Sequence, residues 1–213
     1  MRRSPCPACA ADTGATRAPS RETASMPSDQ PELNDSPEAF MVTGQALRAE
    51  CQGSALAAFE GAHPYPWLVR DLSAESLPEP SFATTFLSEE DLKIGSTGLL
   101  QRIAQRPDGF GFYPLRKNPK NPWKDRIIIG RATNNDVVLR HTSVSKVHAR
   151  ATCRDGRWSL VDAKSTNGTS VDGVPLAPAG DGATLQSHTV VKLGGVVCTV
   201  LSSAELHRAL AGR

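Results

Sequence analysis

The sequence predicts a mainly β fold: a β-sandwich preceded by a partly helical, partly disordered N-terminal region. Short runs rich in Val, Ile, Leu and aromatic residues alternate with clusters of turn residues from Phe110 onward. Several clusters contain residue pairs that tolerate the positive φ angles of tight hairpins. The spacing of the runs is typical of a sandwich or a barrel. The hairpin pairs are Asp155-Gly156, Asp172-Gly173 and Gly194-Gly195.

The first segment, residues 1–36, is rich in Ala, Pro, Ser, Thr and Asp and holds hardly any large apolar residue. Such a segment cannot bury enough apolar surface to offset the entropy that is lost on ordering, so we expect it to be disordered. Its Cys6-x-x-Cys9 pair is half of a zinc site. Because no second pair follows, we expect no bound metal.

The second segment, residues 37–105, is predicted to be a mostly helical extension or linker. Ser36 offers a capping hydroxyl before a proline, and an Ala/Leu/Arg/Glu-rich stretch runs on to about Glu60. A proline-interrupted stretch at residues 63–66 ends this helix. The apolar residues 67–69 that follow form a small hydrophobic anchor.

A second helix start is predicted at Ser88, where acidic residues follow the capping hydroxyl and match the helix dipole. One helix, or two short ones, then continues to about Gln105. The sequence leaves open whether this extension packs on the sandwich.

The third segment, residues 106–202, is the predicted sandwich, and residues 203–213 form a tail with a short helix. Each strand is an apolar run that is bounded by turn residues. The predicted strands cover residues 110–115, 126–130, 137–139, 147–153, 157–162, 169–171, 189–193 and 196–201.

The charges are balanced in total, with 24 Lys and Arg against 22 Asp and Glu, but they are unevenly distributed. From Pro27 to Asp91 the acidic residues greatly outnumber the basic ones, whereas from Leu115 to Arg150 the reverse holds. We therefore expect an anionic ligand to bind in the C-terminal half.

The chain contains no apolar run long enough to cross a membrane, and the residues after Met1 lack the apolar core of a secretory signal. An odd count of five cysteines fits reduced thiols better than a disulfide framework. We expect a cytoplasmic protein without a membrane partner or a cofactor.

Three polar segments lie where predicted strands end: residues 130–136, 143–148 and 165–169. Together they supply two cations, several hydroxyls and an amide. This set suits an oxyanion, which offers many acceptor lone pairs. Loops on a rigid sandwich are a usual place for binding groups.

The order and spacing of these residues closely resemble the forkhead-associated (FHA) domain over roughly residues 110–202. The resemblance implies an FHA-type β-sandwich that binds phosphothreonine peptides and is not an enzyme. Residues 135–139 also fit the start of a strand in that family. The signature residues are Gly130-Arg131, Ser145-x-x-His148, Asp162 and Asn167-Gly168-Thr169.

By resemblance, Arg131 donates to the phosphate as a forked cation, Ser145 gives its hydroxyl, and Lys146 adds a second charge. Thr166 is a further donor, and Asn167 bonds the backbone of the ligand. The position of Lys146 is frequently Arg in the family. Lysine lacks the planar fork, so we expect a less directional contact.

Four residues of the signature receive structural roles by the same resemblance. His148 fixes the loops by hydrogen bonding, and Asp162 belongs to the same framework. Gly130 and Gly168 permit loop conformations that a side chain would strain.

The expected function is a signalling or adaptor module that recognises proteins phosphorylated by Ser/Thr kinases. One alternative is an FHA-like docking module without phosphate dependence. A second is nucleic-acid binding through the basic loop at residues 116–124, although solvated loop charge explains that run better. A third is hydrolysis by Ser145, His148 and an aspartate, Asp136 or Asp162, but no nucleophile elbow accompanies them.

A regulatory hypothesis concerns Thr84 and Thr85, which precede the acidic residues 88–91. If either were phosphorylated, this part of the chain could fold back into the domain's own site. A helix start within a linker is the simpler reading.

Overall fold

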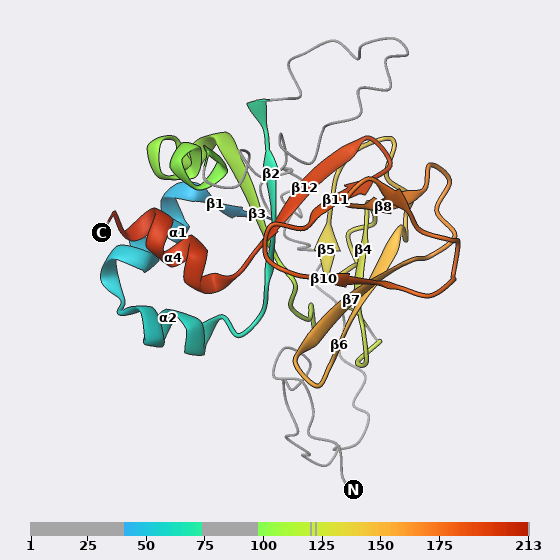
Figure 1. Ribbon diagram of the computed structural model, residues 1–213, viewed down its shortest axis with the longest axis horizontal. Coiled ribbons are helices and arrows are strands. Elements are labelled where there is room, and N and C mark those ends of the chain that lie inside the picture. The colour runs from blue at the N-terminus through green and yellow to red at the C-terminus, as the bar shows by residue number, and fades with distance from the viewer. Residues whose placement is uncertain (1–40, 74–97, 120, 122, 213) are drawn as a thin grey trace, which may run out of the picture.

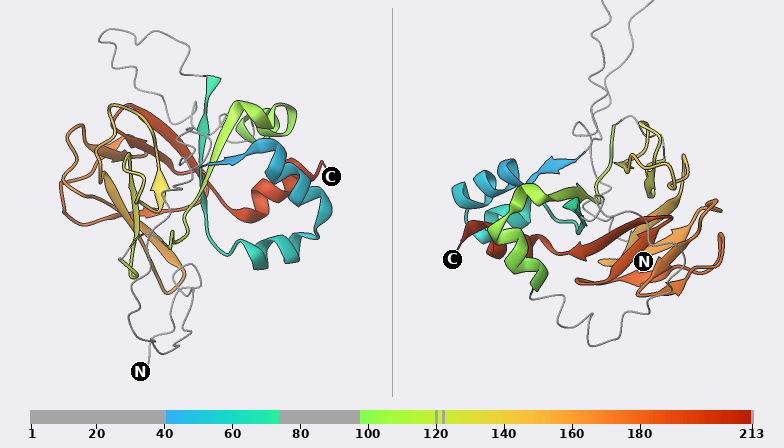
Figure 2. Two further views of the ribbon diagram at one scale, coloured as in Figure 1. Left: turned by 180° about the vertical axis from the view of Figure 1, so that it is seen from behind. Right: turned by 90° about the horizontal axis from the view of Figure 1, so that it is seen from above.

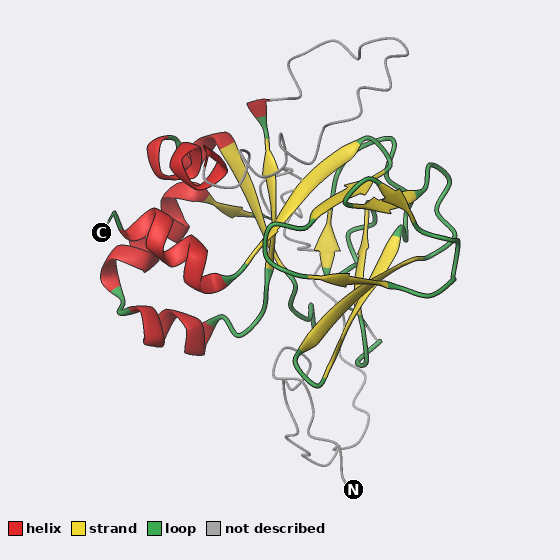
Figure 3. Cartoon of the chain, viewed as in Figure 1, coloured by secondary structure: helices red, strands yellow, loops and turns green. Residues whose placement is uncertain are grey.

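The computed structural model describes residues 41–73, 98–119, 121 and 123–212. Within them, two β-sheets pack face to face, and helices gather on one side of the sandwich (Figures 1 and 3). The predicted mainly β, sandwich-type fold is confirmed. Residues 1–36, and with them Cys6 and Cys9, lie outside the described residues, as do Thr84 and Thr85.

The larger sheet has seven strands in the order β1-β3-β2-β12-β11-β8-β9, and all its pairs are antiparallel. Its strands are β1 (Val42–Thr43), β2 (Trp67–Asp71), β3 (Phe110–Pro114), β8 (Thr169–Val171), β9 (Val174–Pro175), β11 (Val190–Leu193) and β12 (Val196–Leu201).

The smaller sheet has five strands in the order β10-β7-β6-β4-β5, in which only the β4·β5 pair is parallel. Alternate residues of β6 and β7 are buried, as expected when one face of a sheet covers the core and the other faces outward. Its strands are β4 (Ile127–Gly130), β5 (Val137–Val138), β6 (Ala149–Arg154), β7 (Arg157–Asp162) and β10 (Ala183–Leu185).

The hairpin turns follow the sequence signals. Asp155 and Gly156, between β6 and β7, both have positive φ angles, 51° and 75°. Asp172 and Gly173, between β8 and β9, have φ angles of 48° and 80°. Asp and Gly adopt this region at low cost, and its twist matches that of the flanking strands.

The N-terminal region differs from the expectation, because residues 67–71 form a strand and not merely an apolar anchor. Strand β2 lies between β3 and β12 and pairs with both. Its residues 67–70 are all buried, so it lacks the alternation by which a one-sided strand is recognised. The sandwich therefore takes a central strand from a segment that we expected to be mostly helical. Where the folding unit begins stays a prediction.

The helical part of this region also differs in detail. The single helix that we expected up to about Glu60 is two helices, separated at Ser54 and Ala55. Residues 98–105 are helical, as expected, while the start predicted at Ser88 lies outside the described residues. The helices are α1 (Gly44–Gly53), α2 (Leu56–Ala62), α4 (Ser203–Ala211) and a 3-10 turn, η4 (Pro107–Gly109).

Helix α4, which the sequence predicts as a short C-terminal helix, closes this side of the molecule and contacts α1 and α2 (Figure 2). Its start is fixed by a capping box between Ser202 and Glu205. Ser203 Oγ accepts a hydrogen bond from Trp67 Nε1 at 3.0 Å, and His207 Nε2 bonds the carbonyl of Ser54 at 2.9 Å. These bonds join the C-terminal helix to the N-terminal region of the described chain, away from the loops considered next.

Candidate functional site

Three loops meet at one end of the smaller sheet: residues 131–136 join β4 to β5, residues 139–148 join β5 to β6, and residues 163–168 join β7 to β8. Main-chain hydrogen bonds tie them together. The amide of Arg131 donates to the carbonyl of Ser145 at 2.9 Å, and Ala163 donates to His148 at 2.9 Å. These backbone hydrogen bonds restrict how the loops can move, so the side chains of the three loops keep fixed positions relative to one another.

The hydroxyls of Ser145 and Thr166 lie side by side, although 21 residues separate them in the chain. Ser145 Oγ accepts a hydrogen bond from the backbone N–H of Thr166 at 3.0 Å. The two hydroxyl oxygens are 3.4 Å apart. Thr166 is exposed and Ser145 is half-buried, so this pair presents hydroxyl groups at the surface.

Arg131 and Lys146 are the exposed cations of the same loops. Arg131 Nε donates to the carbonyl of Val144 at 3.0 Å, which orients the guanidinium and leaves its two terminal amino groups for another acceptor. Among the residues that the structure describes, no carboxylate forms an ion pair with either cation. Both charges are therefore available to an anion from outside.

Asn167 links the third loop to the second. Its Nδ2 donates to the carbonyl of Ser143 at 2.8 Å, and the side chain is exposed. Because the amide nitrogen is used within the protein, the remaining acceptor of this side chain is Oδ1. An Oδ1 held in this way can accept an N–H group from an extended peptide.

His148 is fully buried beneath these groups and bonds the main chain at both ring nitrogens. Nδ1 accepts the N–H of Ser145 at 3.0 Å, so the proton resides on Nε2, which donates to the carbonyl of Gly168 at 3.0 Å. The neutral ring thus holds the Ser145 loop against the Gly168 loop.

The same geometry predicts a pH dependence of stability. Burial lowers the pKa of His148, while the bond to Gly168 and the charge of Asp162 act in the opposite direction. Above its ordinary pKa of about 6.5 the ring is neutral in both the folded and the unfolded chain. Below it, the unfolded chain takes up the proton first, so the free energy of unfolding falls as the pH falls.

We expect this loss between about pH 7.5 and about pH 5.5 to be smaller in His148→Asn, because asparagine does not titrate there. Urea unfolding of both proteins across this range measures it. Equal losses in the two proteins would show that His148 is not the group responsible.

Asp162 organises the third loop from the end of β7. Burial alone would raise its pKa, but the hydrogen bonds that its carboxylate accepts from Ser165 and Thr169 outweigh burial, and the pKa is lowered. Ser165 Oγ and Thr169 Oγ1 each donate to Asp162 Oδ1 at 2.6 Å. The ionised carboxylate therefore fixes the segment that carries Thr166 and Asn167.

The two signature glycines act differently from each other. Gly168 has a φ of +75°, where a side chain is strained. Gly130 has no such φ. A Cβ at this position would lie 2.4 Å from the carbonyl oxygen of Lys146 and 2.9 Å from that of Ser145. Gly130 is needed because two backbones approach each other closely.

Replacing Gly130 with alanine is expected to lower the free energy of unfolding by about 1–3 kcal/mol, because the methyl group must push the Lys146 carbonyl away. Urea denaturation measures this change. Gly61→Ala in α2, where a Cβ meets no atom within 4 Å, is the matched control and should not destabilise. Equal stability of the Gly130→Ala protein and the wild type would contradict the close-approach argument.

The sequence did not reveal the role of Asp136, whose side chain is fully buried behind the first loop. Its carboxylate accepts hydrogen bonds from the backbone N–H of Ile128 at 2.6 Å and of Asn118 at 2.7 Å, and pairs with Lys117 Nζ at 2.9 Å. Sequence spacing gives no sign that residues 117 and 136 meet. The signal available was only a polar pair, Asn135-Asp136, before an apolar strand.

Asn135, also buried, completes the support of this loop: its Nδ2 donates to the carbonyl of Lys146 at 2.6 Å. Two adjacent polar residues thus connect the first loop on one side to the 116–121 segment and on the other to the second loop. Lys117, which we read as solvated loop charge, is instead 10% exposed and used internally.

The proposed Ser-His-Asp arrangement is not formed by these side chains. Ser145 Oγ contacts Thr166, and the ring nitrogens of His148 are both occupied by main-chain groups. His148 therefore has no ring nitrogen with which to take a proton from Ser145 Oγ.

Two further searches concern the described ranges alone. They contain no group of three or more His, Cys, Asp or Glu side chains arranged to hold a metal ion. No helix within them is sufficiently long and apolar to span a bilayer.

Comparison with known proteins relates part of the chain to one family of domains. Residues 127–194 match the family model of the FHA domain. No curated protein matches the chain. Among solved structures, an FHA domain from a study of phosphothreonine-dependent FHA interactions is 29% identical, covering 42% of this chain and 82% of that chain, with a TM-score of 0.35.

Two other solved structures are also similar to part of the chain. The FHA domain of the CT664 protein from Chlamydia trachomatis is 28% identical, covering 36% of this chain and 75% of that one, with a TM-score of 0.33. The FHA domain of a hypothetical protein from Arabidopsis thaliana is 25% identical, covering 46% and 76%, with a TM-score of 0.36.

Proposed function

We propose that the FHA domain formed by residues 127–194 binds phosphothreonine peptides through the three loops at the end of the smaller sheet. In this proposal the protein is a signalling or adaptor module for partners phosphorylated by Ser/Thr kinases. The observation that carries it is the convergence of Arg131, Lys146, Ser145 and Thr166 on one surface, with both cations lacking a carboxylate ion pair within the described residues.

The chemistry of this group favours a phosphate over an unmodified side chain. A phosphate ester brings about −1.5 to −2 charge and three strong acceptor oxygens. Hydrogen bonds to such an ion are roughly twice as strong as neutral ones. An unmodified threonine offers one hydroxyl and no charge, so the two cations gain nothing from it. We therefore expect binding to depend on phosphorylation.

Each side chain has a separate task. The terminal amino groups of Arg131 give two parallel hydrogen bonds to phosphate oxygens, because Val144 already fixes the orientation of the guanidinium. Lys146 adds a less directional point charge. Ser145 and Thr166 donate hydroxyl hydrogens, and Asn167 Oδ1 accepts an N–H from the peptide backbone, which sets the direction of the ligand.

The proposal is one of binding and not of catalysis, and it includes no cofactor. The support for binding and not catalysis is that both ring nitrogens of His148 form hydrogen bonds with the main chain. The proposal also places the protein in the cytoplasm, where reduced thiols persist. Burial raises the pKa of Cys198 to about 12, which keeps this thiol protonated and unreactive at neutral pH.

Nucleic-acid binding through residues 116–124 has less support. Lys117 Nζ bonds Asp136 Oδ2 at 3.0 Å and two main-chain carbonyls, those of Trp123 at 2.5 Å and Arg126 at 2.8 Å. A cation used in this way is not free to neutralise a backbone phosphate.

A peptide-library screen tests the proposal. Peptides that carry phosphothreonine at a fixed position should be retained by the protein, while the same peptides with unmodified threonine should not. Retention that is independent of phosphorylation would favour the docking module without phosphate dependence, and the proposal would be wrong.

A further inference from the structure

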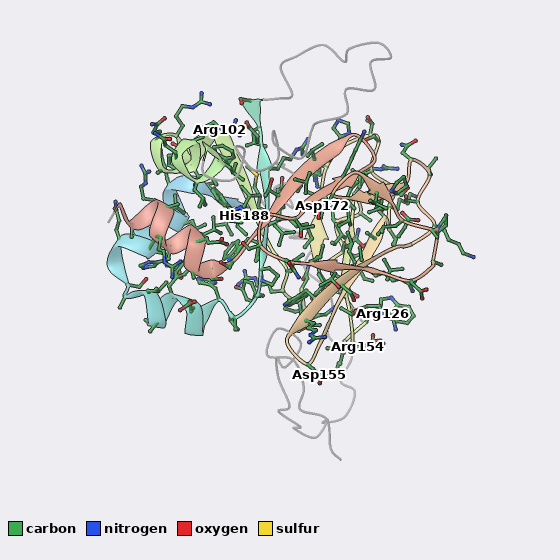
Figure 4. The ribbon with its side chains drawn as sticks, viewed as in Figure 1. Arg102, Arg126, Arg154, Asp155, Asp172 and His188 are labelled. Atoms are coloured by element: carbon green, nitrogen blue, oxygen red, sulfur yellow. The ribbon has the colours of Figure 1, made fainter. Side chains whose placement is uncertain are left out.

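The outward face of the smaller sheet carries three arginines. Alternate side chains of β6 point away from the core, and these include Arg150 and Arg154. In β7 the side chain of Arg157 does the same. Arg154 and Arg157 are directly opposite each other in the register of the two strands, so both guanidinium groups leave the sheet on the same side. Figure 4 shows Arg154 at this end of the sheet, near Arg126.

No salt bridge neutralises these three arginines within the part of the chain that the structure describes. One carboxylate, that of Asp155 at the tip of the β6–β7 hairpin, lines the same part of the surface. Lys124 adds a further exposed cation. Like charges that are directly opposite each other on two strands destabilise the pair. The fold therefore gains nothing from placing Arg154 opposite Arg157, whereas an anionic ligand benefits from both charges.

Hydroxyl groups lie beside these cations. Thr152, Ser159 and Thr184 are opposite one another in the register of β6, β7 and β10. Thr152 Oγ1 is 2.9 Å from Ser159 Oγ. The sheet surface is hollowed where Ser159 and Thr184 meet Arg154 and Arg157. Arginine, serine and threonine side chains are among the usual hydrogen-bond donors to the phosphate groups of nucleic acids.

An exposed tryptophan borders the same face. Trp123 is 58% exposed, and the guanidinium carbon of Arg126 lies 5.4 Å from the centre of its ring. Arg126 directly precedes Ile127, the residue of β4 that pairs with Ala151 of β6. The ring is therefore held beside the strand that carries two of the three arginines, with more than half of its surface open to solvent. Such a ring offers a stacking platform to a nucleic-acid base.

This surface changes the interpretation of the basic run at residues 116–124. Lys117 is used within the protein and is not free to bind phosphate, but Trp123 and Lys124 at the end of the run are exposed. An acidic polypeptide would use the cations alone, because carboxylates need no stacking partner. A nucleic acid uses the cations and the aromatic ring together. The combination on this face therefore favours a single-stranded nucleic acid.

We propose that the outward face of the smaller sheet binds single-stranded nucleic acid, with Arg150, Arg154 and Arg157 at its phosphates and Trp123 stacked on a base. From residue 150 to residue 154 the strand rises about 14 Å, which is the axial rise of about four stacked nucleotides. The inference goes beyond the proposed function, because Arg154 and Arg157 lie at the opposite end of β6 and β7 from the loops of the proposed phosphothreonine site. The two ligands are expected to bind at once.

The experiment measures binding of a fluorescein-labelled oligothymidylate to the full chain by fluorescence anisotropy. The probe has about 12 nucleotides, within the site sizes of known single-strand binding surfaces. The titration is repeated at several salt concentrations. If Lys124 and the three arginines neutralise three or four phosphates, the slope of log K against log salt should be about −2 to −3, because each phosphate contributes about −0.7 in a single strand.

Two variants separate charge from stacking. Arg154→Ala combined with Arg157→Ala should weaken binding roughly 10-fold at about 50 mM salt and bring the slope closer to zero by about 1.4. Trp123→Ala should weaken binding roughly 5-fold or more without changing the slope, because stacking releases no counterions, and Trp123→Phe should retain part of the affinity. Lys192→Ala combined with Arg208→Ala is the matched control, since it removes two exposed cations from β11 and α4.

Three results would overturn the inference. An equal loss of binding in the control variant would mean attraction to any cation of the protein. Binding of polyglutamate that depends on the arginines, together with full oligonucleotide binding by Trp123→Ala, would assign the face to an acidic protein. No binding of the oligonucleotide by the wild type would refute the inference and leave the proposed function standing, since phosphothreonine-peptide affinity should be the same in the wild type and in the double arginine variant.

Discussion

Replacing Arg131 with alanine is expected to weaken binding of a phosphothreonine peptide roughly 10- to 100-fold, because hydrogen bonds to a charged group contribute about 1.5–3 kcal/mol. The substitution removes both terminal amino groups that would face the phosphate. It also removes the bond from Nε to Val144, but this bond lies at an exposed side chain, so the fold should persist.

Isothermal titration calorimetry measures this loss, and circular dichroism verifies that the variant is folded. Arg154→Ala is the matched control, because Arg154 is an exposed cation next to Asp155 at the tip of the β6–β7 hairpin (Figure 4). That tip lies at the opposite end of β6 from the loops. If Arg131→Ala, Arg154→Ala and the wild type bind the phosphothreonine peptide with equal affinity, Arg131 does not contact the phosphate.

Replacing Asp136 with alanine is expected to lower the free energy of unfolding by about 3–5 kcal/mol, the usual cost of breaking a buried ion pair by removing one partner. The side chain of Asp136 is 0% exposed. Its loss leaves the Lys117 ammonium without its carboxylate partner and two backbone N–H groups without their acceptor. Because these groups hold the loop that carries Arg131, peptide affinity should fall as well.

Urea unfolding measures the stability change, and Asp125→Ala is the matched control. Asp125 also pairs with an arginine, Arg126, at 2.5 Å, but its side chain is 64% exposed. An exposed pair of this kind contributes about 0–1 kcal/mol. A loss in Asp136→Ala no larger than that in Asp125→Ala would show that the buried carboxylate does not anchor the loop.

The turn chemistry of the sandwich could be predicted from sequence because it is local. Asp155-Gly156 and Asp172-Gly173 specify tight hairpins through their own backbone preferences, whatever surrounds them. Strand β2 could not be recognised from sequence, because it ends at Asp71 and its partner strand β3 begins 39 residues later, at Phe110. The burial of its residues 67–70 depends on parts of the chain distant in sequence, which no local pattern reports.

The candidate site divides in the same way. The residues that we propose to bind the phosphate, Arg131, Ser145 and Thr166, stand out in sequence because a polar group between apolar runs is conspicuous. The structure brings the hydroxyls of Ser145 and Thr166 to 3.4 Å from each other. The ion pair of Lys117 with Asp136 joins two loops that lie close together only in the tertiary structure, so it could not be predicted from sequence. The need for glycine at position 130 was also predicted for the wrong reason, since it arises from the approach of the Lys146 backbone and not from φ.

The most direct test of the central claim is an NMR titration of the isotopically labelled protein with a phosphothreonine peptide and with its unphosphorylated counterpart. The account predicts amide chemical-shift changes that cluster at Arg131, residues 145–146 and residues 166–168 with the phosphopeptide alone. Unchanged spectra with the phosphopeptide, or the same changes with both peptides, would contradict it.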